Sequence, residues 1–140
     1  MSMSLSPYLN FAGNGREAMT YYQSVFGGEL HLFGFAEYGL DGPADGLMHG
    51  NLQVRPGMSI SASDAMPGAE QTWGGTRVYC SIFGDDAATM QGWFEALAVD
   101  GSIGMPLEKQ VWGDLYGLVK DKYGIEWMFN VGAAEGTQQS

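Results

Sequence analysis

An internal repeat constrains the fold of this chain more than any other feature of its sequence. Residues 13–28 read GNGREAMTYYQSVFGG, and residues 85–101, displaced by 72 positions, read DDAATMQGWFEALAVDG. A later part of the chain matches at a displacement of 67 positions. The aligned residues are both apolar or both glycine: Met90 with Ala18, Phe94 with Tyr22, Gly117 with Gly50, Gly124 with Gly57 and Trp127 with Ile60. Two similar halves predict a pseudo-two-fold arrangement, with a cavity where the halves meet.

The hydrophobic pattern predicts the same order of elements in both halves: a strand, a helix and three further strands. The expected elements of the first half are strands over 5–11, 29–35, 47–54 and 58–63 and a helix over 14–26. Those of the second half are strands over 77–83, 102–107, 114–120 and 125–131 and a helix over 87–99. We therefore expect an α+β fold of two βαβββ modules. They cover about 5–64 and 76–131, with a joint over 65–75 and a frayed tail over 132–140.

Local signals at the start of the chain support this reading. The expected first strand alternates, with Leu5, Pro7, Leu9 and Phe11 on one side and Ser6, Tyr8 and Asn10 on the other. Asn14 is the predicted N-cap of the following helix, and Glu17, three residues later, completes a capping box. Gly27 and Gly28 are expected to end that helix.

Composition excludes several classes of partner. Sixteen acidic and six basic residues give a formal net charge of −10, which disfavours nucleic acid and anionic membrane surfaces as partners because both require clustered Lys and Arg. The sequence lacks an apolar run of the roughly 18 residues needed to span a membrane and lacks a secretory signal pattern. A single cysteine, Cys80, excludes an intramolecular disulfide framework, and it is expected to be a buried, unreactive thiol. We therefore expect a cytoplasmic protein.

Six segments carry a resemblance to a known family. They are PYLNF (7–11), REAMTYYQSVFGGEL (16–30), LMHGNL (47–52), SASDAMP (61–67), MPLEKQVWGDLYG (105–117) and DKYGIEWMFN (121–130). Together they resemble the PhnB-like family of the glyoxalase/bleomycin-resistance/extradiol-dioxygenase superfamily, also called vicinal oxygen chelate proteins. The resemblance implies that each half curls its mostly antiparallel strands into a cupped sheet with its helix outside. It also implies a ligand inside the cup and a homodimer.

The resemblance locates four positions at which metal-dependent members of the superfamily carry ligands. These positions, on the first and last strands of each module, hold Ser6, Ser61, Arg77 and Met128. Zn²⁺ and similar ions prefer imidazole, thiolate or carboxylate ligands, and an arginine repels a cation. We therefore expect neither a metal nor another cofactor at these positions.

His49 is the leading candidate for a catalytic acid or base. It shares a strand face with Leu47, Asn51 and Gln53 and so lines the expected cup. Glu108 and Asp114 bracket the Trp112–Gly113 segment, where a carboxylate near a tryptophan in an apolar pocket can serve as a general acid or base. Each has a structural alternative. His49 can be a hydrogen-bonded structural histidine, and the two carboxylates can pair with Lys109 or Lys120 or cap a turn. His31 is expected to be exposed or structural.

Aromatic and polar residues at alternating strand positions predict a ligand-binding wall. Tyr116 is the repeat counterpart of His49, so the two are expected to face each other across the cup. The predicted ligand contacts are Tyr8, Asn10, Arg77, Tyr79, Trp112, Tyr116 and Met128. Ordinary core packing explains the aromatic members of this set equally well.

Two functions of different class follow from these observations. The first is a small-molecule binding protein whose ligand lies in the cup between the modules, without the usual metal site of the superfamily. The second is a lyase, isomerase or oxygenase that uses His49 with Glu108 or Asp114, with or without a nonstandard divalent metal. PhnB-like proteins are sometimes labelled demethylubiquinone methyltransferases, but the strand–GxGxG–helix nucleotide site and its following acid are missing from this sequence.

Overall fold

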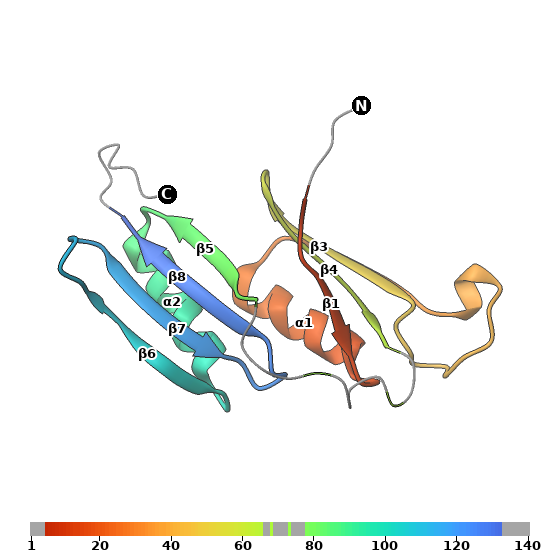
Figure 1. Cartoon of the computed structure of the whole chain (residues 1–140). Coiled ribbons are helices and arrows are strands. Elements are labelled where there is room, and N and C mark those ends of the chain that lie inside the picture. The colour runs from red at the N-terminus through yellow and green to blue at the C-terminus, as the bar shows by residue number, and fades with distance from the viewer. Residues whose placement is uncertain (1–4, 66–67, 69–72, 74–77, 133–140) are drawn as a thin grey trace. The chain divides into compact units, whose positions relative to one another are not determined.

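The computed structural model describes residues 5–65, 68, 73 and 78–132 of the chain. The chain divides into two compact units, Met1–Gly74 and Gly75–Ser140. Each unit contains a four-stranded sheet with one α-helix against one face (Figure 1). Within the described ranges, none of the helices is both long and apolar enough to traverse a membrane.

The first unit forms its sheet in the order β1-β4-β3-β2, and β1 runs parallel to β4 while the other pairs are antiparallel. Its elements are β1 (Tyr8–Phe11), α1 (Gly15–Phe26), β2 (Glu29–Phe33), the 3-10 helix η1 (Ala36–Tyr38), β3 (His49–Arg55) and β4 (Met58–Asp64). Apolar residues recur on one side of α1 at helical spacing, so that side packs on the sheet. The buried core comprises Ala18, Met19, Tyr22 and Phe26 of α1 with Leu9, Phe11, Leu52, Ile60 and Ala62 of the sheet.

The second unit repeats this topology, with the order β5-β8-β7-β6 and a parallel β5·β8 pair. Its elements are β5 (Cys80–Gly84), α2 (Ala87–Ala98), β6 (Ser102–Lys109), β7 (Leu115–Lys120) and β8 (Glu126–Val131). Its buried core comprises Met90, Phe94 and Leu97 of α2 with Val119, Trp127, Phe129 and Val131 of the sheet. The predicted α+β fold of two βαβββ modules with mostly antiparallel sheets is therefore confirmed.

Equivalent glycines allow the same backbone geometry in both units. Gly57 and Gly124, in the turns before the last strands, have φ of +81° and +91°, a region that residues with a side chain rarely adopt. A Cβ on Gly28 would lie 2.4 Å from the carbonyl oxygen of Gln53, and one on Gly101 would lie 2.2 Å from that of Lys120. These close approaches bring the chain leaving each helix directly against the central strands.

The first strand of each unit is shorter than its sequence predicts. β1 begins at Tyr8 instead of residue 5, and the Leu5 side chain is 98% exposed. β5 begins at Cys80 instead of residue 77, and Arg77 lies outside the described residues. Both are edge strands, so their length is set by the parallel register with β4 and β8, which the alternation of apolar residues does not encode.

Other strand ends shift by smaller amounts. β2 ends at Phe33, before the predicted residue 35, because the chain turns there into η1. β6 extends to Lys109, beyond the predicted residue 107, because it pairs with β7 along its length. Parts of the predicted joint and of the predicted tail lie outside the described residues.

The two helices begin differently. Asn14 occupies the N-cap of α1, but its side chain makes no capping hydrogen bond, so the predicted capping box is wrong. The Gly15 N–H instead donates to Asp64 Oδ1 at 2.7 Å, and the Leu47 N–H donates to Asp64 Oδ2 at 2.9 Å. Helix α2 is capped locally, since Asp86 accepts from the Thr89 N–H at 3.2 Å. A distant carboxylate thus takes the place of the expected local cap of α1.

Candidate functional site

The sheet face opposite α1 in the first unit carries mostly polar side chains and is called here the polar face. Strand register places Tyr8, Ser61, Asn51 and His31 in one row across the four strands. Further along the strands, Asn10 lies opposite Ser63 on β1 and β4, and His49 lies opposite Phe33 on β3 and β2. Alternate residues of the same strands, such as Leu9 and Leu52, lie buried on the side of α1. The polar face therefore results from period-two alternation together with register.

Tyr8 and His49 are in direct contact on the polar face. The Tyr8 hydroxyl lies 3.0 Å from His49 Nδ1, at hydrogen-bond distance, and the two rings stack with centroids 5.8 Å apart. Tyr8 is 51% exposed, and His49 is half-buried. Alternation predicted both residues on one face, and the structure joins them across β4. The pair presents a hydroxyl and an imidazole side by side.

Two further rings extend this contact into a row. Phe33 stacks on the other side of His49, with centroids 6.4 Å apart and an interplanar angle of 17°. Tyr38, in η1, meets Phe33 edge-on, with centroids 6.0 Å apart and an angle of 68°. We call Tyr8, His49, Phe33 and Tyr38 the aromatic ladder.

Neutral hydrogen-bonding groups surround the ladder. The Asn51 amide donates to Ser61 Oγ at 3.0 Å, linking β3 and β4. Asn10 and Ser63 lie opposite each other on β1 and β4. The polar face thus combines ring surface with amide and hydroxyl groups.

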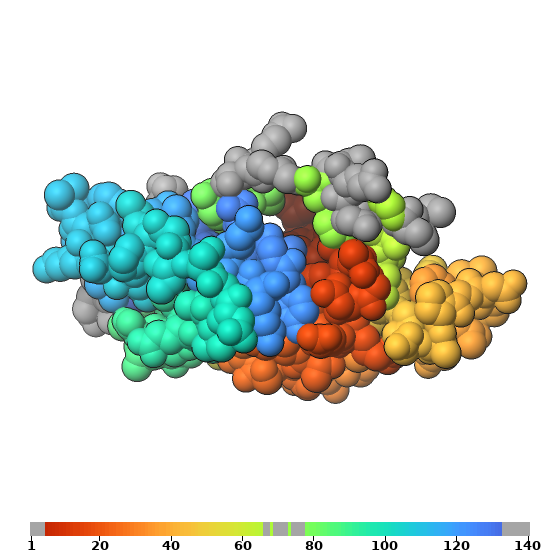
Figure 2. Space-filling model, turned by 90° about the horizontal axis from the view of Figure 1, so that it is seen from below, coloured from red at the N-terminus to blue at the C-terminus, as the bar shows by residue number. Residues whose placement is uncertain are grey.

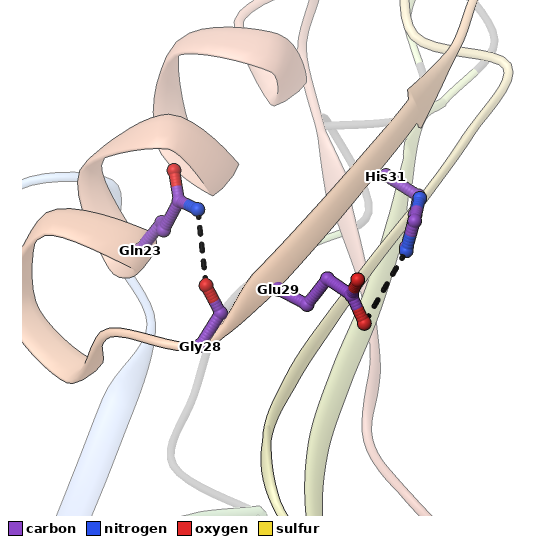
Figure 3. A network of polar contacts seen from close by, with 4 residues as sticks. All are labelled: Gln23, Gly28, Glu29 and His31. Carbon is purple, nitrogen blue, oxygen red and sulfur yellow. Dashed lines mark hydrogen bonds and ion pairs between the residues drawn. The ribbon is translucent and has the colours of Figure 1, made fainter.

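His31, the second histidine of the chain, has different surroundings. Its side chain is 55% exposed and lies 3.8 Å from Glu29 Oε1, at the start of β2 (Figure 3). Close by, the Gln23 amide donates to the Gly28 carbonyl at 3.1 Å, which ties the end of α1 to the chain entering β2. The prediction that His31 is exposed is confirmed.

The corresponding face of the second unit is mostly apolar and is called here the apolar face. One register row contains Ser81, Met128, Leu118 and Met105, and the next contains Phe83, Asn130, Tyr116 and Glu108. Trp112, in the hairpin between β6 and β7, meets Tyr116 edge-on with centroids 5.8 Å apart. The apolar face therefore brings together the predicted ligand contacts Trp112, Tyr116 and Met128.

The two candidate carboxylates of the second unit differ in burial. Asp114 is 4% exposed and accepts a hydrogen bond from the Asn130 amide at 3.0 Å. Its carbonyl also accepts from the Gln110 N–H at 2.8 Å, which closes the hairpin. Glu108 is exposed and lies opposite Tyr116 in the register of β6 and β7. Asp114 therefore has a clear structural role, whereas Glu108 is open to solvent.

The predicted pairing of His49 with Glu108 or Asp114 stays a prediction, because these residues belong to different units. Tyr79 is half-buried and precedes β5. Ser6 precedes β1 and is exposed. The convergence of Tyr8, Asn10, His49, Tyr79 and Tyr116 on one space likewise stays a prediction.

Strand register identifies the residues opposite two of the metal-ligand positions inferred from the resemblance. The residue opposite Ser61 in the parallel pair is Tyr8, and the residue opposite Met128 is Ser81. Over the described part of the chain, three or more His, Cys, Asp or Glu side chains do not gather anywhere in a group able to hold a metal ion.

Cys80 is half-buried instead of fully buried as predicted, but its thiol is unreactive as expected. Burial raises the pKa of its thiol from 9.0 to about 11, and the negative charge of Asp121 adds to this rise. Because thiolate is the reactive form, Cys80 is a poor nucleophile near neutral pH.

Sequence reasoning missed Phe33 and Tyr38. Phe33 alternates with His31 on β2, so the period of two already indicated its face. Its contact with His49 depends on the antiparallel register of β2 and β3. Tyr38 belongs to the connection between the strands predicted over 29–35 and 47–54, and its sequence carries no signal for the contact with Phe33.

Comparisons with known proteins agree on one family. A sequence model of the Glyoxalase/Bleomycin resistance protein/Dioxygenase superfamily matches residues 5–129. Protein YjdN of Escherichia coli (strain K12) is 34% identical over an alignment that covers 97% of this chain and 100% of YjdN. The crystal structure of protein PA1353 from Pseudomonas aeruginosa matches with 34% identity and a TM-score of 0.78, covering 94% of this chain and 99% of that chain.

A more distant solved structure shows the same fold. It is a PhnB protein from Bacillus cereus, described as a candidate 3-demethylubiquinone-9 3-methyltransferase. The match has 23% identity and a TM-score of 0.74, and it covers 93% of this chain and 100% of that chain.

Proposed function

The chain belongs to the glyoxalase/bleomycin resistance protein/dioxygenase superfamily, and we propose that it binds a small organic molecule at the polar face of its first unit. The observation that carries this proposal is the contact between the Tyr8 hydroxyl and His49 Nδ1, 3.0 Å apart on a partly exposed sheet face. A phenol and an imidazole in contact offer both a donor and an acceptor to a ligand. Small-ligand sites typically combine ring surface with a few such polar groups.

The composition of the polar face indicates which ligands it favours. Its hydrogen-bonding groups are the side chains of Tyr8, Asn10, Asn51, Ser61 and Ser63, together with the imidazoles of His49 and, on the edge strand β2, His31. Anionic ligands are disfavoured, since the chain carries a net charge of −10. The cross-strand pairs named above for this face contain no Lys or Arg. We propose that binding requires no transition metal, because serine and tyrosine are poor ligands for such ions.

We propose the apolar face of the second unit as a ligand-contact surface in its own right, through Trp112, Tyr116 and Met128. Aromatic rings and methionine offer polarisable surface to an apolar ligand. The roles predicted for Arg77 and Tyr79 remain part of this proposal. The measurement is the loss of ligand affinity in Tyr116→Ala, and an unchanged affinity would contradict a binding role for the apolar face.

The test uses the two histidines as a matched pair. A fragment library is screened by ligand-observed NMR against the wild type, His49→Ala, Tyr8→Phe and His31→Ala. We expect His49→Ala and Tyr8→Phe to weaken bound fragments about five- to tenfold, the value of one or two hydrogen bonds. His31→Ala removes an imidazole from the same face, but His31 lies on the edge strand β2 beside Glu29 and outside the aromatic ladder, so it should weaken binding much less than His49→Ala. Equal losses in both histidine variants, or fragments insensitive to His49, would contradict the proposal.

The same contact favours an enzyme as the second candidate. The hydroxyl of Tyr8 engages Nδ1 of His49, which fixes the imidazole and leaves Nε2 for proton transfer to a substrate. We propose that any such reaction, of the lyase, isomerase or oxygenase type, uses His49 as its acid–base group. The discriminating result is conversion of a bound compound by the wild type that His49→Gln abolishes without abolishing binding.

A homodimer is also proposed. The edge strand β6 is exposed over most of its length, including the apolar side chains of Ile103 and Met105, and exposed edges of this kind invite pairing with another chain. Light scattering should give twice the monomer mass of 15.1 kDa. A monomer mass at micromolar concentration would contradict the proposal.

A further inference from the structure

We infer that the ligand of the polar face contains a planar, uncharged ring system and that Tyr38 selects for this planarity. The inference rests on the proposed function, because it names the ligand class of the same site. It adds Phe33 and Tyr38 to the site, which the Tyr8–His49 pair alone does not require.

The geometry of the aromatic ladder supports a flat ligand. The rings of Tyr8, His49 and Phe33 are stacked, with interplanar angles of 28° and 17° between neighbours. Tyr38 then stands at 68° to Phe33, so Phe33 and Tyr38 form an aromatic corner. A flat ring in this corner can stack on one wall and meet the other edge-on, the two arrangements that aromatic pairs prefer. A saturated ring of the same size makes neither contact well.

The ladder also has a polar end. Tyr8 and His49 lie at the end away from Tyr38, with their hydroxyl and imidazole groups in contact. A planar ring with one neutral hydrogen-bonding substituent therefore fits both parts of the ladder. The acidic residues Glu37, Asp41 and Asp45, close to Tyr38 in the sequence, disfavour an anionic group in the aromatic corner.

Tyr38 is held in place by an ordered, hydrogen-bonded connection between β2 and β3. Arg16 of α1 donates from Nη2 to the Gly46 carbonyl at 3.3 Å and from Nε to the Asp45 carbonyl at 3.4 Å. The Glu37 carboxylate accepts from the Gly34 N–H. Phe35 packs so closely on Gly42 and Gly46 that a Cβ at either position would lie within 2.7 Å of its ring. The connection therefore positions Tyr38 although that side chain is 49% exposed.

This connection is an addition to the repeated plan. In the second unit, β6 and β7 are joined by a short hairpin that the Gln110 N–H closes on the Asp114 carbonyl. In the first unit, the corresponding connection runs from residue 34 to residue 48 and includes η1. It projects at the margin of that unit, in amber (Figure 2). Long connections in compact domains usually carry function, and here the connection carries the outer wall of the aromatic corner.

Calorimetric titrations with three probes test the inference. The probes are 2-naphthol, which is planar and neutral, decahydro-2-naphthol, which is its saturated counterpart, and 2-naphthoate, which is planar and anionic. We expect 2-naphthol to bind at least tenfold more tightly than either of the other two. Equal affinity for the planar and the saturated alcohol would overturn the inference.

Two variants isolate Tyr38. Tyr38→Leu, which keeps an apolar side chain without the ring, should weaken 2-naphthol binding roughly three- to tenfold, the value of one aromatic pair, and leave decahydro-2-naphthol unchanged. Leu40→Ala, at an exposed apolar residue of the same connection, is the matched control and should change neither. An unchanged 2-naphthol affinity in Tyr38→Leu would overturn the role of Tyr38.

Failure of this inference is distinguishable from failure of the proposed function. If both alcohols bind equally and both require His49, the polar face is a ligand site but does not select planar rings. If neither alcohol binds, the inference fails, while library fragments whose binding requires His49 would still support the proposed function. If both alcohols and the library fragments bind independently of His49, the proposed function fails and the inference fails with it.

Discussion

The two units share one backbone plan but carry opposite chemistry on the sheet faces that their helices leave open. In the first unit the cross-strand pair Asn51 and Ser61 is hydrogen bonded. The repeat places Leu118 and Met128 at the equivalent positions of the second unit, where they also form a cross-strand pair. On the helix side both units keep apolar residues, such as Leu52 in one and Val119 in the other. The comparison teaches that packing against the helix restricts one face, while the other face is available for recognition.

The units also differ in where they use hydrogen-bonded carboxylates. Asp64, at the end of β4, joins the start of α1 to Leu47 just before β3. The repeat counterpart of Asp64 is Val131, which cannot do this. The second unit instead uses Asp121, which accepts from the N–H groups of Tyr123 and Ile125 and from the Trp127 indole at 2.8 Å. One plan is thus secured by two different polar networks.

The largest expected effect is a loss of unfolding free energy that differs between the two faces of the first sheet. Leu52→Ala should lower the free energy of unfolding by about 2–5 kcal/mol, because it leaves a cavity under α1. His49→Ala should lower it by less than about 1 kcal/mol, since His49 is only half-buried on the other face. Urea unfolding followed by circular dichroism measures both. Comparable losses would mean that His49 belongs to the core and that the contrast between faces is wrong.

An intermediate effect compares the two carboxylates. Asp121→Asn should cost about 3 kcal/mol, because it places an amide N–H against the buried Trp127 indole N–H. Asp64→Asn should cost about 1 kcal/mol, since Asp64 is only half-buried and solvent can replace its partners in part. Thermal melts of the two variants under identical conditions decide the order. The reverse order would show that the first unit depends more on its polar network.

The smallest expected effect concerns pH and Cys80. The pKa of its thiol is raised to about 11 from 9.0, mainly by burial, so the unfolded chain loses this proton first as pH rises. Stability from this group is therefore complete below pH 9 and declines between about pH 9 and 11. Urea midpoints of the wild type should fall more steeply over this range than those of Cys80→Ala. Parallel pH profiles would mean that the thiol ionises as easily in the folded protein as in the unfolded chain.

Much of the fold was predictable because its determinants are local or repeated. The apolar spacing of Ala18, Met19, Tyr22 and Phe26 identifies the buried side of α1, and all four side chains are buried. Alternation alone assigned Tyr8, Asn10 and His49 to one sheet face. The internal repeat then carried the same order of elements from one half to the other.

The features that escaped prediction depend on partners distant in sequence. The first strands begin where register with β4 and β8 begins, and no pattern within those strands encodes this. The cap of α1 comes from Asp64, so inspection of the residues around Asn14 could not reveal it. The ladder contact of Tyr38 depends on how Arg16 and Phe35 fold the connection between β2 and β3. For these features the determining contact is tertiary.

The contrasting helix starts have a consequence for the order in which the chain acquires structure during synthesis. The N-terminal cap of helix α2 is local, because Asp86 accepts hydrogen bonds from the N–H and the hydroxyl of Thr89. This helix can therefore nucleate as soon as it leaves the ribosome. Helix α1 lacks its cap until Asp64, 49 residues downstream of Gly15, has been synthesised and reaches it. Closing so long a loop is slow and entropically costly. The first half to be translated is therefore the one whose helix becomes secured only when its last strand arrives.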